Sequence, residues 1–213
     1  MKITGTFITI EGIEGVGKTT AVQFIQHYLL QHQREHVITR EPGGTAIAEQ
    51  IRQILLTPNP EDTIVPATEL LLMFACRAQH VEKVVLPALQ AGKWVVSDRF
   101  VDATYAYQGG GRKMNMTQIN MLEKWIVGNL QPDLTILLDA PPAIGLARAK
   151  HRSPQDRIEQ EKIDFFERVR QVYLSRAKQF PERFSVIDAT QPLAKVQDEL
   201  TKNLETIAKR AVR

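Results

Sequence analysis

The sequence predicts an α/β fold in which a five-stranded parallel sheet carries helices on both faces. Five short apolar segments rich in β-forming residues recur along the chain, and a helical pattern separates each one from the next. A glycine-rich loop stands between the first segment and the first helical pattern. Strands that alternate with helices pair in parallel, because the crossover helices pack back onto the sheet. The expected strands are residues 6–11, 36–40, 94–98, 134–139 and 184–188.

The loop after the first strand has the sequence GIEGVGKT, which fits the eight-position pattern of a phosphate-binding loop (P-loop). Its glycines lack a Cβ, so the backbone can adopt positive φ angles and bring its amides against an anion. Lys18 can reach the β- and γ-phosphates, and the Thr19 hydroxyl can bind Mg²⁺. An ordinary glycine turn before a helix is the alternative. The candidate ATP-binding residues are Gly12, Ile13, Glu14, Gly15, Val16, Gly17, Lys18 and Thr19.

Length and composition predict a single domain, residues 1–213, because neither a linker nor a change in composition divides the chain. No apolar run approaches the roughly 20 residues that cross a bilayer, so we expect no membrane insertion. The net charge of +3, from 27 basic and 24 acidic side chains, argues against a nucleic-acid partner. The first residues look like a strand rather than a signal peptide, and Cys76 has no second cysteine, so we expect a cytoplasmic location.

Polar residues stand at the ends of four expected strands. In a parallel sheet the functional groups collect beyond the carboxyl ends of the strands, so we expect these residues to face one crevice. Asp98 can hold Mg²⁺ or its waters, and Arg99 can bind a second phosphate; a structural ion pair is the alternative. The strand-end residues are Glu11, Arg40, Glu41, Asp98, Arg99 and Asp139.

Two further segments carry candidate site residues. Residues 106–112, AYQGGGR, place an aromatic side chain and an amide beside three glycines, which suits close approach by a planar base and a sugar. A flexible loop is the alternative. Basic residues gather at 148–157 around a Ser-Pro turn, which predicts a mobile lid that neutralises charge and excludes water. A solvated basic helix face is the alternative.

Taken together and in order, several segments resemble the bacterial thymidylate kinases, P-loop enzymes that phosphorylate dTMP with ATP. The resemblance spans nearly the whole chain and rests on EGIEGVGKTT, TREPGGT, the helix ending FACRAQH, SDRF, TYAYQGGGR and DRIEQE. TREPGGT and AYQGGGR are specific to this family among nucleoside monophosphate kinases. The resemblance implies ATP as donor with Mg²⁺, dTMP as acceptor, and a homodimer.

The resemblance also implies roles around the acceptor nucleotide. Glu14 would lie near the sugar 3′-hydroxyl and the metal, and Tyr107 would crowd the 2′ position and disfavour ribonucleotides. Thr104 and Gln108 would hydrogen-bond near the base. The residues implied for dTMP binding are Glu14, Arg40, Glu41, Pro42, Arg52, Phe74, Arg77, Arg99, Thr104, Tyr107 and Gln108, and those implied for the metal are Thr19, Asp98, Glu14 and Glu159.

One position departs from the family pattern, and one feature selects a branch of the family. The family commonly places a thymine-stacking Phe four residues before the arginine that matches Arg77; that position is Met73 here, so we expect Phe74 to cover the base. The phosphate loop has no basic residue before its lysine, which resembles the branch that carries a catalytic arginine in the lid. The catalytic candidates are Lys18, Glu14, Arg99, Arg152, Arg148 and Arg157, with Arg152 first among the lid arginines.

The sequence therefore predicts a kinase that makes dTDP from dTMP and MgATP by direct in-line transfer, a step toward dTTP. Another monophosphate is the alternative acceptor. The nearest is dUMP, which lacks only the thymine methyl group, worth about 1–3 kcal/mol in a hydrophobic pocket. A P-loop NTPase switch is the alternative from another class. It would carry a basic surface stripe or a guanine-reading Asn-Lys-x-Asp motif, and the sequence shows neither.

Overall fold

The computed structural model describes residues 3–150 and 156–210 and contains a parallel five-stranded sheet in the order β2-β3-β1-β4-β5. Every neighbouring pair of strands in this sheet is parallel. The strands are β1 (Thr6–Glu11), β2 (His36–Arg40), β3 (Trp94–Asp98), β4 (Leu134–Asp139) and β5 (Phe184–Asp188). All five coincide with the segments expected from the sequence, so the predicted fold class is confirmed.

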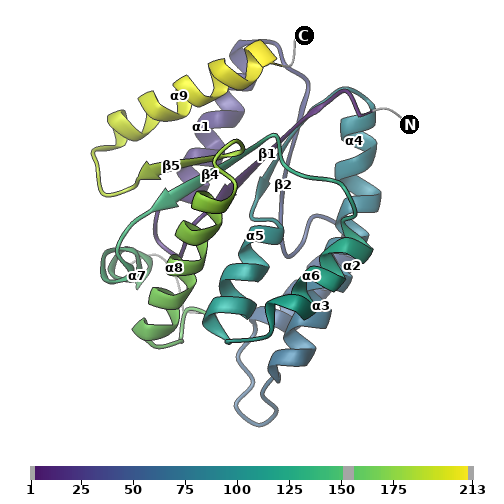
Figure 1. Ribbon diagram of the computed structural model, residues 1–213, viewed down its shortest axis with the longest axis vertical. Coiled ribbons are helices and arrows are strands. Elements are labelled where there is room, and N and C mark those ends of the chain that lie inside the picture. Colours follow the sequence, from purple (N-terminus) through teal and green to yellow (C-terminus); the bar gives the residue numbers. More distant parts are fainter. Residues whose placement is uncertain (1–2, 151–155, 211–213) are drawn as a thin grey trace.

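Helices connect the strands and cover both faces of the sheet. Figure 1 shows α1 and α9 side by side on one face and α8 across the other. They are α1 (Lys18–Gln31), α2 (Ala46–Leu56), α3 (Pro66–His80), α4 (Leu86–Gln90), α5 (Val101–Thr104), α6 (Met116–Ile126), α7 (Pro142–Lys150), α8 (Ile163–Gln179) and α9 (Leu193–Arg210), with π-helical segments η1 (Val81–Val85) and η2 (Tyr105–Gly111). None of the helices in the described ranges is long and apolar enough to cross a membrane.

The strands alternate their side chains between the two faces, as expected for a buried sheet. Phe7 and Val95 join a core cluster with residues of α3 and α4. Ile8, Ile10 and Val96 point the other way and join a cluster with residues of α1 and α9. Both faces are thus filled by apolar packing, and the carboxyl ends of the strands remain for polar groups.

The alternative of a flexible loop for the glycine-rich segment before α6 is wrong, because residues 105–111 form the buried helix η2 against α8. A Cβ on Gly110 would lie 2.9 Å from the Arg168 carbonyl oxygen, and a Cβ on Gly111 would lie 2.4 Å from the Phe165 ring. These two glycines therefore permit packing against α8 rather than the approach of a base and a sugar.

Candidate functional site

A cavity of about 260 Å³ opens at the carboxyl ends of β1, β2 and β3. Its wall also includes α2, α3, η2 and the segment 156–159. Most residues predicted for the site line it, so the topology brings together side chains that are far apart in the sequence. Those residues are Glu14, Gly15, Gly17, Lys18, Thr19, Arg40, Glu41, Pro42, Arg52, Asp98, Arg99, Tyr107, Gln108, Arg157 and Glu159.

The phosphate loop wraps around the ammonium group of Lys18, in the first turn of α1. Lys18 Nζ donates hydrogen bonds to the carbonyl oxygens of Gly12 at 3.1 Å and Ile13 at 2.8 Å. Gly17, the residue that caps α1, has a φ of 95°, a left-handed conformation that favours glycine. The helix therefore begins with its free N–H groups at the cavity, which is the arrangement that binds phosphate.

Burial and the positive charge of Arg99 lower the pKa of Lys18, the charges of Asp98 and Glu14 oppose the shift, and the pKa is about 8 as a result. The ammonium group is still mostly protonated at neutral pH. Lys18 is half-buried beside the cavity, so a polyphosphate in the loop would add negative charge that favours the ammonium form.

Arg99 links the end of β3 to the phosphate loop. Its φ of 72° is left-handed, a strained conformation for a residue with a side chain. The guanidinium donates from Nη1 to the Gly12 carbonyl oxygen at 2.9 Å and from Nη2 to Glu14 Oε1 at 2.8 Å. Tyr107 completes the group, because its hydroxyl donates to both Glu14 carboxylate oxygens and its ring lies 4.7 Å from the guanidinium carbon.

Asp98 and Thr19 form the part of the cavity that fits a divalent cation. The Oδ1 atom of Asp98 is buried without a hydrogen-bond partner among the described residues, and Thr19 lies in the first turn of α1. No group of three or more His, Cys, Asp or Glu side chains within residues 3–150 and 156–210 could hold a metal ion. This sparse donor set fits Mg²⁺, which binds through one or two protein oxygens, phosphates and waters.

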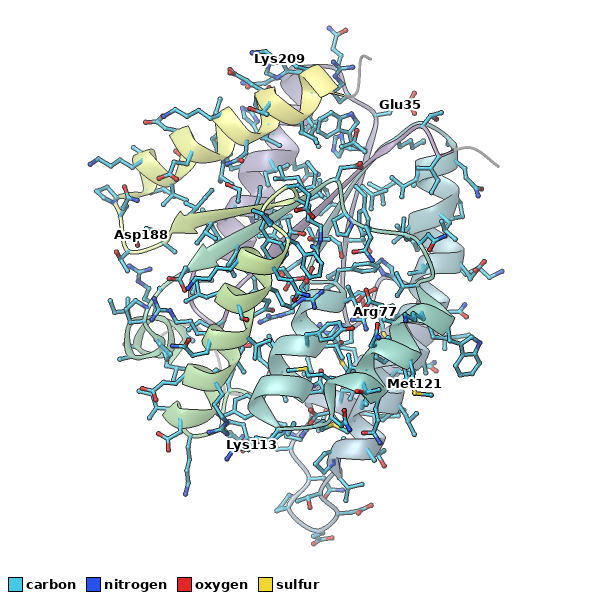
Figure 2. The ribbon with its side chains drawn as sticks, viewed as in Figure 1. Glu35, Arg77, Lys113, Met121, Asp188 and Lys209 are labelled. Atoms are coloured by element: carbon cyan, nitrogen blue, oxygen red, sulfur yellow. The ribbon has the colours of Figure 1, made fainter. Side chains whose placement is uncertain are left out.

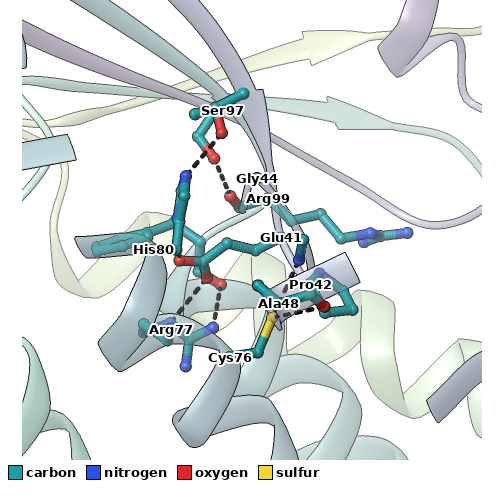
Figure 3. A network of polar contacts seen from close by, with 12 residues as sticks. Glu41, Pro42, Gly44, Ala48, Cys76, Arg77, His80, Ser97 and Arg99 are labelled. Carbon is teal, nitrogen blue, oxygen red and sulfur yellow. Dashed lines mark hydrogen bonds and ion pairs between the residues drawn. The ribbon is translucent and has the colours of Figure 1, made fainter. Parts of the chain in front are cut away.

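A buried network behind the cavity wall orients Arg77 (Figure 3). Glu41 accepts from Arg77 Nε at 2.8 Å and pairs with His80 Nδ1 at 2.8 Å. Arg77 Nη2 donates to the Phe100 carbonyl oxygen, whereas Nη1 has no partner in the described part of the chain. Arg77 is fully buried and is not part of the cavity wall.

Helix α3 presents Met73 to the cavity, not Phe74. The Phe74 ring is 2% exposed and packs in the apolar core, with the Arg77 guanidinium carbon 4.8 Å from its centroid. Successive residues on a helix differ by about 100° in direction, so these two side chains cannot both face the cavity. The geometry therefore favours Met73 as the residue that meets a base and corrects the expectation for Phe74.

The lid arginines do not lie together. Arg148 Nη1 donates to the Ala189 carbonyl oxygen at 2.9 Å and borders a second hollow, of about 270 Å³, between α1 and α9. Arg157 donates from Nε to the Leu55 carbonyl oxygen at 2.8 Å. Its Nη2 donates to Glu69 Oε2 at 2.6 Å. Arg152 and the Ser-Pro turn lie outside the described residues.

The remaining predicted residues differ in their exposure. Arg52 donates from Nη1 to the Pro42 carbonyl oxygen at 2.8 Å, and burial lowers its pKa. Arg40 is exposed and pairs with Glu49 at 2.8 Å. Thr104 is fully buried and is not part of the cavity wall, but its hydroxyl oxygen has no partner within the described ranges.

Two strand ends contradict the expectation that all four face one crevice. Glu11 is fully buried and accepts from the Phe100 amide at 2.8 Å and the Tyr173 hydroxyl at 2.7 Å. Asp139 accepts two hydrogen bonds from Arg170, at 2.7 and 2.8 Å. Both carboxylates are partnered by α8 and lie outside the cavity wall.

Sequence reasoning missed Glu69, a cavity residue in the first turn of α3 with a side chain only 1% exposed. It accepts hydrogen bonds from Gln108, Arg112 and Arg157. One signal was present in the sequence: Glu69 precedes the apolar run LLLMFAC, where an acidic residue must find partners if it is buried. Its partners come from distant positions, which the sequence alone does not reveal.

The fold and the site define a class of protein. A phosphate loop lies after β1, a carboxylate suited to Mg²⁺ lies at the end of β3, and an adjoining cavity carries several arginines. These features define the class of the P-loop phosphotransferases.

Comparison with known proteins identifies the family. The family model "Thymidylate kinase" matches residues 10–200. The chain is 49% identical over 203 residues to a thymidylate kinase of Nitrosospira multiformis, covering 95% of this chain and 98% of that protein. It is 51% identical over 208 residues to one of Pseudomonas entomophila, covering 98% and 99%. The crystal structure of thymidylate kinase from Ehrlichia chaffeensis aligns with a TM-score of 0.77 at 32% identity, covering 94% and 98%.

The chain therefore belongs to the thymidylate kinase family. Enzymes of this family are phosphotransferases that use ATP as phosphoryl donor together with Mg²⁺.

Proposed function

We propose that this protein phosphorylates dTMP to dTDP with MgATP, and that dTMP occupies the cavity beside the phosphate loop. Two buried polar atoms of residues that line this cavity have no partner in the described ranges and carry this proposal: Asp98 Oδ1 and Gln108 Oε1. Each belongs to a residue implied for dTMP or metal binding. An unsatisfied buried polar atom costs about 1–3 kcal/mol, so bound ligands would supply what these atoms lack.

The chain's own residues support direct in-line transfer without a covalent enzyme intermediate. Lys18 would hold the β- and γ-phosphates of ATP, and Arg99 would hold the acceptor phosphate next to them. Asp98 and Thr19 would hold Mg²⁺, assisted by Glu14 and Glu159. When bound, Mg²⁺ neutralises charge on the phosphate oxygens.

The Tyr107–Glu14 pair supports selection of a deoxyribonucleotide. The Tyr107 hydroxyl is fixed by two contacts, at 2.8 and 2.9 Å, to the Glu14 carboxylate. A ring held in this way cannot easily move aside for a 2′-hydroxyl. Glu14 would then be positioned toward the 3′-hydroxyl and the metal, as the family resemblance implies.

We place the catalytic lid arginine at Arg152, within one domain of residues 1–213 whose lid spans about 148–157. Arg148 and Arg157 already donate to protein carbonyl and carboxylate groups, which supports a docking role for both. Arg152→Ala should therefore lower kcat by about 10³-fold or more, with little change in the KM for dTMP. Rapid kinetics on Arg148→Ala and Arg157→Ala provide the matched comparison, and an intact kcat in Arg152→Ala would reject the assignment.

We also propose a homodimer formed through α3 and α6. Three large apolar side chains on these helices are exposed, Leu71 at 59%, Met121 at 66% and Trp125 at 78%. Figure 2 shows Met121 at the rim of the molecule on α6. Light scattering should give the dimer mass for the wild type and the monomer mass for Trp125→Glu, and a monomeric wild type would reject the proposal.

A cytoplasmic location completes the proposal, supported by the single, buried Cys76, which forms no disulfide.

The test of the function is an ADP-release assay with MgATP against dTMP, dUMP, UMP, CMP, AMP and GMP, with products separated by chromatography. Stoichiometric dTDP formation, with lower activity on dUMP, is the expected result. ADP release that is independent of any acceptor would indicate an NTPase instead.

A further inference from the structure

Glu69 is a buried carboxylate at which four segments of the chain meet. Its Oε1 accepts from Gln108 Nε2 at 2.7 Å. Arg112, after η2, donates to it from Nε and from Nη2, the latter at 3.1 Å to Oε2. Arg157 donates to the same Oε2 at 2.6 Å. The contacts connect α3, η2, the residue that follows η2 and the C-terminal end of the expected lid.

The two arginines keep this carboxylate ionised. Burial alone would raise the pKa of Glu69, but hydrogen bonds from Arg112 and Gln108 and the charges of Arg112 and Arg157 outweigh it, so the pKa is lowered. An ionised carboxylate only accepts hydrogen bonds. The part of the Gln108 amide that faces it must therefore be the Nε2 amino group, and the reverse orientation would set two acceptors against each other.

The orientation of the Gln108 amide determines what it offers to the cavity. Gln108 lines the cavity with a side chain that is 2% exposed, and its Oε1 is buried without a partner in the described part of the chain. With Nε2 committed to Glu69, Oε1 is the group that remains for a ligand. A buried acceptor of this kind binds a donor and disfavours another acceptor.

We propose that Glu69 is a positioning residue for base selection: it holds the Gln108 amide so that Oε1 accepts the imide N–H of a thymine or uracil ring. Cytosine has an unprotonated ring nitrogen at that position, so it would place an acceptor against Oε1. The inference rests on the proposed function, because it takes the cavity to be the acceptor site.

The test is Glu69→Gln, a change of nearly the same shape that leaves Gln108 free to turn over. Its kcat and KM for dTMP and for dCMP are compared with those of the wild type. The expected result is a fall of about 10-fold or more in the ratio of kcat/KM for dTMP to kcat/KM for dCMP. The ratio is decisive, because a residue that only supports the fold would lower both values together.

Glu123→Gln is the matched control. Glu123, in α6, also accepts a short hydrogen bond, from the Tyr105 hydroxyl at 2.6 Å, but it does not line the cavity. This variant should keep the wild-type ratio. Since Glu69→Gln also releases Arg157, the KM for ATP and the thermal midpoint are measured for each variant. If Glu69→Gln does not fold, Glu69→Asp, which retracts the carboxylate, carries the same prediction.

A double-mutant cycle with Gln108→Met tests the route of the effect. If Glu69 acts through the Gln108 amide, Gln108→Met alone lowers the ratio of kcat/KM for dTMP to kcat/KM for dCMP. Adding Glu69→Gln to that variant then lowers this ratio little further. Equal and additive losses, or an unchanged ratio in Glu69→Gln, would overturn the proposal. A wild type that forms no dTDP would instead overturn the proposed function, so the two failures are distinguishable.

Discussion

The two ends of the cavity are built in different ways. At the phosphate end, one continuous loop supplies main-chain N–H groups, and Lys18 and Arg99 are fixed to main-chain oxygens of that loop. At the base end, side chains from separate segments converge on the carboxylate of Glu69. The phosphate end suits any nucleotide phosphate, since every nucleotide carries the same anion. The base end depends on the orientation of one amide and can therefore discriminate.

This contrast predicts that changes at the two ends have different kinetic signatures. The largest effect is expected at the phosphate end. Lys18→Ala should lower kcat by roughly 10²–10³-fold, because it removes a half-buried cation that acts on charge developing during transfer. Steady-state kinetics at saturating dTMP measure it, with Lys93→Ala, from an exposed pair with Glu35, as the control. A decrease in kcat of less than 10-fold would show that Lys18 does not stabilise the transferring phosphoryl group.

A smaller effect, mainly on KM, is expected at the base end. Met73→Ala should raise the KM for dTMP by about 10-fold with little change in kcat, because it removes an apolar contact with the bound base. Leu30→Ala, from the exposed side of α1, should leave both constants unchanged. An unaltered KM in Met73→Ala would show that another residue contacts the base, and it would weaken the contrast between the two ends of the cavity.

The third prediction concerns stability behind the phosphate end, where the readout is not a change in the kinetic constants. Burial, with a further contribution from Asp102, raises the pKa of Glu11 from 4.5 to about 8. Between these values the folded state binds a proton that the unfolded state has lost, so the free energy of unfolding falls as pH rises through this window. The slope is at most about 1.4 kcal/mol per pH unit.

Glu11→Gln should remove this slope, because a neutral amide can keep the contacts to Phe100 and Tyr173 without titrating. Urea unfolding at several pH values measures the effect. Glu35→Gln, at an exposed position, is the control and should keep the wild-type slope. Parallel profiles for Glu11→Gln and the wild type would show that Glu11 is ionised in the folded state.

Sequence patterns predicted the fold and marked the phosphate loop because both leave local signals. Short apolar segments rich in β-forming residues marked the strands, and the loop needs glycine wherever its φ angles are positive. The base end leaves no such signal. Glu69, Gln108 and Arg157 lie far apart in the sequence. The packing of α3 against η2, and of residue 157 against the end of α2, brings them together. The choice between Met73 and Phe74 likewise depends on how α3 is rotated about its axis relative to the cavity. The apolar pattern of the sequence does not determine that rotation.

The central claim is that phosphoryl transfer passes directly between nucleotides bound at these two sites. The most direct test is a single-turnover rapid-quench experiment with excess enzyme, [γ-³²P]ATP, Mg²⁺ and dTMP. Label should move from ATP to dTDP in one kinetic step, with neither labelled protein nor free phosphate. Label that appears first on the protein, or in free phosphate at the rate of ATP loss, would contradict direct transfer.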